Sequence, residues 1–80
     1  MPHVNVKLYP GRSDEDKAEL ARAIAKNVTT ILKCGDESVS VAIEDVPPGD
    51  WVVKVFKPEI AGKTDKLFKK PGYNPLQRSA

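Results

Sequence analysis

The 80-residue chain is poor in the residues that crosslink small proteins, with one cysteine, Cys34, and one histidine, His3. One cysteine cannot form an intrachain disulfide, and this pair leaves no Cys/His cluster to hold a metal ion. The chain also lacks the run of about 18 apolar residues that a membrane span needs, and polar residues begin too early for a signal peptide. We therefore expect a cytoplasmic protein with neither a membrane partner nor a bound metal.

Charge of one sign is also scarce, because 13 Lys and Arg residues against 11 Asp and Glu give a net charge of +2. This excess is too small to predict nucleic-acid binding. Lysines do gather between Lys63 and Lys70, where helical spacing and Asp65 favour a solvated helix face. A polyanion-binding patch is the alternative interpretation of this segment.

Two stretches alternate between apolar and polar residues, which is typical of half-buried strands. The first covers residues 3–9 and the second covers residues 38–46. Between them, residues 14–33 have the apolar spacing of an amphipathic helix that follows an N-cap at Ser13. Strand, helix and strand in this order predict a βαβ unit, with parallel strands and the long helix on one face of the sheet.

The rest of the chain is predicted to hold a short strand or extended segment at 51–56, a helix at 58–70 and a flexible tail at 74–80. The fold class is therefore α+β, and residues 1–80 make a single domain. A chain this short buries only about 60–65% of its unfolded surface. Two strands under one helix also leave sheet edges open, so we expect a homodimer.

Pro2 directly precedes the first predicted strand. Removal of the initiator methionine would make its nitrogen a terminal secondary amine. An α-amino group has a pKa near ~8 in model peptides, and burial or neighbouring cations lower it. Proton abstraction beside a carbonyl needs a base of this kind. The alternative is that Pro2 is only a permissive second residue.

Several segments together resemble the oxalocrotonate tautomerase family, whose members are small enzymes with an amino-terminal catalytic proline. They are Pro2 with its strand, the stretch PGRSDEDK at 10–17, the long helix, and the strand SVSVAIEDV before PPGDW. The ending KKPGY at 69–73 is similar to a dimeric subgroup with a C-terminal helical extension. The resemblance implies a tautomerase-like domain, a homodimer and no cofactor.

The resemblance further implies roles for three residues. Pro2 would be the general base of keto–enol proton transfer on a small 2-keto acid or its enol. Arg12 falls where the family has an arginine that binds a substrate carboxylate, although it also suits a solvent-facing position before a helix cap. Trp51 lies near the family's aromatic pocket residue, and a place in the core is its alternative.

Ser40 departs from the family's pattern, because a second arginine that binds substrate falls at this position. A hydroxyl can bind substrate but has no charge, which favours a simple 2-keto acid, such as an aryl pyruvate enol, over a dicarboxylate. His3 has no recognisable Ser, Cys or metal partner in the sequence. It is interpreted as a strand-face residue or as a hydrogen-bond donor that supports the site.

Three functional hypotheses stay open. The first is an isomerase that uses Pro2, which the presence of both Pro2 and Arg12 favours. The second is a catalytically degenerate member that binds a small ligand or a protein as a dimer, which Ser40 favours. The third is activation of water by Pro2, as in dehalogenating relatives of the family, although the charged residues that this needs are not identifiable here.

Overall fold

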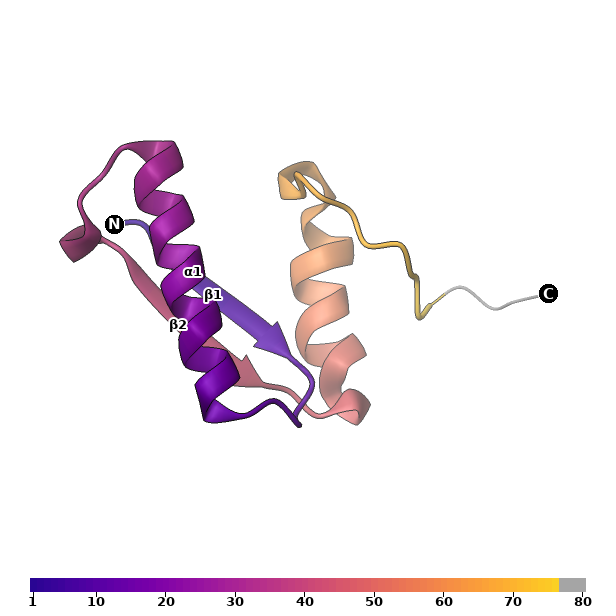
Figure 1. Ribbon diagram of the computed structural model, residues 1–80. Coiled ribbons are helices and arrows are strands. Elements are labelled where there is room, and N and C mark those ends of the chain that lie inside the picture. Colours follow the sequence, from indigo (N-terminus) through magenta and orange to yellow (C-terminus); the bar gives the residue numbers. More distant parts are fainter. Residues whose placement is uncertain (77–80) are drawn as a thin grey trace. The chain divides into compact units, whose positions relative to one another are not determined.

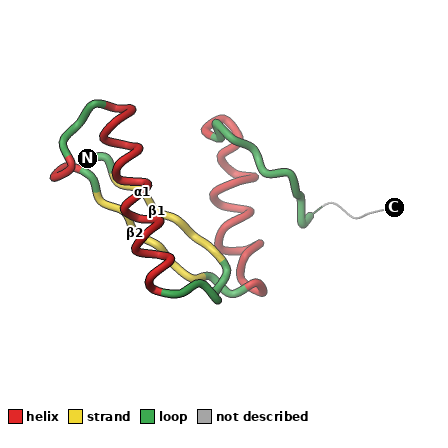
Figure 2. The backbone as a smooth tube through the Cα atoms, in the orientation of Figure 1, coloured by secondary structure: helices red, strands yellow, loops and turns green. Residues whose placement is uncertain are grey.

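The computed structural model describes residues 1–76, and its chain divides into two compact units, of which the second begins at Pro48. The first unit holds the strands β1 (His3–Leu8) and β2 (Ser40–Asp45), the helix α1 (Asp14–Leu32) and the short turn η1 (Asp36–Ser38). The second unit holds helical segments (Figures 1 and 2).

The first unit is the βαβ unit that the sequence predicts. β1 and β2 pair in parallel, with a register that runs from His3 opposite Ser40 to Leu8 opposite Asp45. A parallel pair needs a long crossover, and α1 supplies it and lies across the two strands (Figure 1). The α+β fold class is therefore confirmed, and β1, α1 and β2 each end within two residues of the prediction.

α1 covers one face of this sheet, and an ion pair identifies that face. Lys17 of α1 contacts Asp45 with 2.9 Å between Nζ and Oδ2. Because side chains alternate along a strand, Asp45 shares its face with Ile43 and, through the register, with Val6. The opposite face is therefore turned away from α1 and carries six mostly polar side chains. They are His3, Asn5, Lys7, Ser40, Ala42 and Glu44.

The start of α1 agrees with the sequence. Ser13 has extended backbone angles, and its Oγ accepts a hydrogen bond from the backbone N–H of Asp16 at 3.0 Å. Asp14, Glu15 and Asp16 fill the first turn, where negative charge is favourable near the helix N-terminus. The N-cap fixes where the loop after β1 ends and so positions Arg12.

The prediction of a strand or extended segment at 51–56 is wrong, because these residues are helical. After the turn η2 (Pro48–Asp50), the π-helix η3 spans Val52–Ile60, and the 3-10 segment η4 spans Ala61–Lys66. The predicted helix at 58–70 thus begins earlier and ends earlier than expected. Val55 and Phe56 are both 5% exposed, so helical rather than alternating spacing buries the apolar side chains.

Pro58 lies inside η3 instead of at the first turn of a new helix. Proline has no N–H to donate, so a regular α-helical hydrogen-bond ladder cannot continue through this position. The wider turn of a π-helix is typical of such an interruption. This explains why one irregular helix replaces the predicted strand and helix.

Tyr73 connects the end of the described chain to η3. Its ring lies 5.8 Å from that of Phe56 at an interplanar angle of 44°, and its hydroxyl accepts a hydrogen bond from Trp51 Nε1 at 3.0 Å. Tilted aromatic pairs of this kind add to the stability that burial supplies. Of the predicted tail at 74–80, residues 74–76 form a turn and the others lie outside the described residues.

Candidate active site

Pro2, His3 and Ser40 lie together where both strands begin, and we call them the Pro2 cluster. The backbone N–H of Ser40 donates to the carbonyl oxygen of Pro2 at 3.1 Å. The side chains of His3 and Ser40 are joined by a hydrogen bond of 2.6 Å between Nδ1 and Oγ. Pro2 is half-buried, whereas His3 and Ser40 are exposed, so the cluster is open to a ligand.

The parallel pairing explains why these residues meet. Parallel strands begin at the same edge of a sheet, and the register places His3 directly opposite Ser40. The preceding chain is fixed by a second contact, because the α-amino group of Met1 donates to the carbonyl oxygen of Ser38 at 2.6 Å. These two hydrogen bonds therefore hold Met1 and Pro2 against Ser38 and the start of β2.

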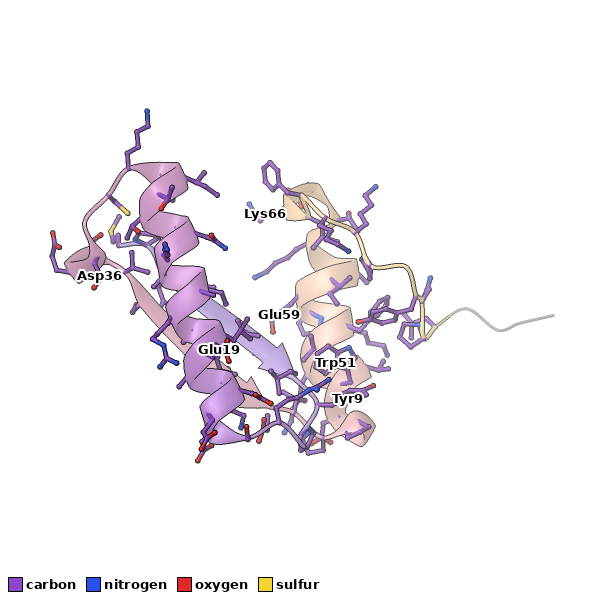
Figure 3. All side chains as sticks on the ribbon, viewed as in Figure 1. Tyr9, Glu19, Asp36, Trp51, Glu59 and Lys66 are labelled. Carbon is purple, nitrogen blue, oxygen red and sulfur yellow. The ribbon has the colours of Figure 1, made fainter. Side chains whose placement is uncertain are left out.

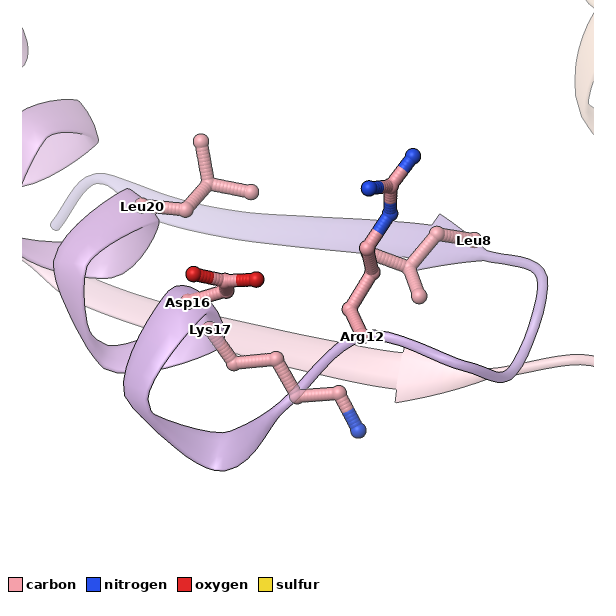
Figure 4. A pocket seen from close by; sticks show the side chains of 5 residues that line it. All are labelled: Leu8, Arg12, Asp16, Lys17 and Leu20. Carbon is pink, nitrogen blue, oxygen red and sulfur yellow. The ribbon is translucent and has the colours of Figure 1, made fainter.

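Arg12 lines a separate pocket of about 220 Å³ in the same unit (Figure 4). The other lining residues are Leu8, Asp16, Lys17 and Leu20. In Figure 4 the guanidinium of Arg12 and the ammonium of Lys17 point in opposite directions, and Lys17 pairs with Asp45. Among the side chains of residues 1–76, Arg12 has no ion-pair partner, so its guanidinium is available to an anion.

Pro2 and the Arg12 pocket lie at opposite ends of β1. Pro2 precedes the strand, and Leu8, which ends it, lines the pocket. Six residues at about 3.3 Å each separate Pro2 from Leu8 by roughly 20 Å. A small 2-keto acid is much shorter than this distance. One substrate molecule therefore cannot contact Pro2 and Arg12 of the same chain.

Trp51 belongs to the second unit, where it directly precedes η3 (Figure 3). It is half-buried, and its indole N–H is bonded to Tyr73. This bond orients the indole within its own unit. The roles expected for Trp51, as a pocket wall or as a core residue, stay predictions.

Lys17 and Asp45 were not predicted from the sequence as neighbours of the candidate site. Opposite charge is the only signal that they carry, and it becomes informative once the strand register is known. The register puts Asp45 at the end of β2, next to the start of α1. Both His3 and Ser40 are candidate site residues from the sequence, but their pairing is not predicted from it.

Two kinds of site are absent from the part of the chain that the structure describes. No three His, Cys, Asp or Glu side chains within residues 1–76 are grouped so that they could hold a metal ion. Over the same range, none of the helices has both the length and the apolar character that a membrane span requires.

Comparison with known proteins points to one family. The family model described as "Tautomerase enzyme" matches residues 2–58. A protein of Xylella fastidiosa named "Probable tautomerase" is 43% identical over 76 residues, which are 95% of this chain and 93% of that protein. "Tautomerase PptA" of an Enterobacter species is 44% identical over 75 residues, 92% of this chain and 99% of its own length.

Solved structures agree with the sequence relatives. TomN, a 4-oxalocrotonate tautomerase homologue of the tomaymycin biosynthetic pathway, is 34% identical, with a TM-score of 0.60 over 62% of this chain and 77% of its own. A structure titled apo unFused 4-OT is 31% identical, with a TM-score of 0.59 over 61% of this chain and 80% of its own.

Proposed function

This chain belongs to the tautomerase family and is an enzyme of that class, and we propose that Pro2 is its general base. The proposed reaction is keto–enol proton transfer on a small 2-keto acid or its enol, in the cytoplasm and without a cofactor. The placement of Pro2 supports the proposal: it is half-buried, directly precedes the exposed His3, and its carbonyl accepts a hydrogen bond from the backbone of the exposed Ser40.

Removal of Met1 is the step that would create the base. Met1 is 97% exposed, so its side chain contributes almost no packing that processing would lose. The carbonyl of Pro2 would still accept the bond from Ser40, so the ring would stay at the head of β1. Its nitrogen would change from an amide into a secondary amine, which in its neutral form can take a proton from carbon or from an enol oxygen.

Arg12 is proposed to bind the substrate carboxylate from a second copy of the chain. The charge-assisted pairing of a guanidinium with a carboxylate suits this role. Because Pro2 and the Arg12 pocket are separated by the length of β1, the arginine that serves Pro2 must come from elsewhere. A homodimer that extends the open two-stranded sheet would supply it, with Trp51 proposed as an apolar wall of the site.

Mixed dimers test the shared site. Pro2→Ala and Arg12→Ala chains are inactive or weakened alone, but half of the dimers formed by co-refolding them should hold one intact site. The mixture should therefore recover about a quarter of the wild-type kcat/KM for a 2-keto acid enol. If Pro2 and Arg12 of one chain formed the site, no activity would return on mixing.

A second mixture is the matched control. Wild-type chain refolded with an equal amount of the Pro2→Ala/Arg12→Ala double variant should keep about a quarter of the activity when sites are shared, and about half when each chain has its own. The base itself is tested on protein whose intact mass shows loss of Met1. Failure of this protein to tautomerise any 2-keto acid enol, with no labelling of Pro2 by an alkylating analogue, would favour a ligand-binding dimer.

A further inference from the structure

A hydrogen bond of 2.6 Å joins Nδ1 of His3 to Oγ of Ser40. A serine hydroxyl can donate or accept, and a neutral imidazole donates from one ring nitrogen and accepts at the other. When the Ser40 hydroxyl donates, Nδ1 of His3 is the acceptor.

This direction fixes the position of the histidine proton. A neutral imidazole carries one proton on its two ring nitrogens, so a ring that accepts at Nδ1 carries its proton on Nε2. His3 is exposed, and within residues 1–76 the only hydrogen bond of its ring is the one to Ser40. In this tautomer the Nε2–H is a donor with no protein partner in the described chain.

Ser40 connects His3 with the proposed base. His3 follows Pro2 directly in the chain, and Ser40 contacts both residues, through its backbone N–H to Pro2 and its side chain to His3. The same sheet face also carries Lys7 and Glu44, which are register partners of opposite charge farther along the strands. Neither of these two residues belongs to the Pro2 cluster, in which the ring of His3 is the side chain next to Pro2 in the sequence.

We propose that Nε2–H of His3 binds the 2-oxygen of the substrate during proton transfer, and that Ser40 is a positioning residue that holds His3 in this tautomer. When Pro2 removes a proton from the carbon beside the carbonyl, the electron pair of the C–H bond moves into the carbon–carbon bond and charge develops on the oxygen. A preorganised donor stabilises that charge. The Pro2 ammonium then protonates the oxygen, and His3 keeps its own proton.

The assignment deepens the proposed function, on which it rests, by defining the substrate class. A neutral donor matches a carbonyl or enol oxygen, whereas a second carboxylate would require a positive charge to offset its desolvation. The substrate expected for the Pro2 cluster is thus a monocarboxylic 2-keto acid.

Nitrogen NMR of the imidazole tests the tautomer without any assay of activity. His3 is the single histidine, so the two ring nitrogens of ¹⁵N-histidine-labelled protein need no further assignment. We expect the Nε2–H tautomer in the wild type and in Ser40→Thr, and a mixture in Ser40→Ala. Ser38→Ala is the matched control, because the Ser38 hydroxyl donates to Gly35 instead. An Nδ1–H tautomer in the wild type, or no response to Ser40→Ala, would overturn the assignment.

Kinetics test the donor. His3→Leu should lower kcat about a hundredfold to a thousandfold, as loss of a donor to a developing oxyanion does, with a smaller change in KM. His3→Gln keeps an N–H and should recover part of the loss. Both variants should unfold at the wild-type temperature, because the side chain is exposed.

The two proposals fail in different ways. If the mature wild type is active and His3→Leu retains its kcat, the donor role is wrong while Pro2 catalysis stands. If the mature wild type has no tautomerase activity, the proposed function is wrong, and the donor role is rejected with it whatever the tautomer.

Discussion

Replacing Phe56 by alanine should destabilise the protein severely. The side chain is 5% exposed and its ring packs 5.8 Å from that of Tyr73. Truncation of a buried phenylalanine costs about 3–5 kcal/mol, because apolar contacts are lost and a cavity remains. An 80-residue domain has a free energy of unfolding of only about 4–12 kcal/mol, so this loss is a large part of the total.

The chain contains its own control, because the other of its two phenylalanines, Phe68, is fully exposed. Phe68→Ala should change the free energy of unfolding by no more than about 0.5 kcal/mol. Thermal unfolding followed by circular dichroism at one protein concentration compares the variants, and Phe56→Ala should melt roughly 12 °C or more below the wild type. Equal melting temperatures for the two variants would refute the helical packing assigned to η3.

Three further predictions concern the first unit. Ser13→Ala should cost about 1 kcal/mol through loss of the N-cap, and Ser13→Asp should restore most of it in urea unfolding. Lys17→Met should cost less than about 1 kcal/mol, because the Lys17 and Asp45 side chains are 21% and 39% exposed; a loss above 2 kcal/mol would contradict the solvent-screened pair. For mature enzyme, kcat/KM should rise with pH through the pKa of the Pro2 amine, since only the neutral amine accepts a proton; a profile without a rising limb would exclude Pro2 as the base.

The first unit could be predicted because its signals are local. Alternation marks each strand, the three-to-four spacing marks α1, and Ser13 with its acidic neighbours marks the helix start. At 51–56 the local signal is ambiguous, because a short run of β-branched and aromatic residues suits either a strand or a buried helix face. In the observed helix Phe56 contacts Tyr73, which lies seventeen residues further along the chain (73 − 56). This contact cannot be predicted from residues 51–56 alone.

The candidate site was predicted residue by residue but not as an arrangement. Pro2, His3 and Ser40 were each named, yet their contact depends on a register that joins residues far apart in the chain. The predicted parallel pairing already implies that these residues meet, because parallel strands begin at the same end of a sheet. The distance between Pro2 and Arg12 was also accessible, because the length of the strand between them sets it.

The parallel register also constrains the order in which the protein folds. Every pair in the sheet joins residues 37 positions apart, from His3–Ser40 (40 − 3) to Leu8–Asp45 (45 − 8). No hairpin can nucleate such a sheet, so closure of a long loop, shortened by formation of α1, must come first. At synthesis rates of 5–20 residues per second, β1 waits roughly 2–7 s on the ribosome before β2 has been made. During that interval β1 has no strand partner within its own unit.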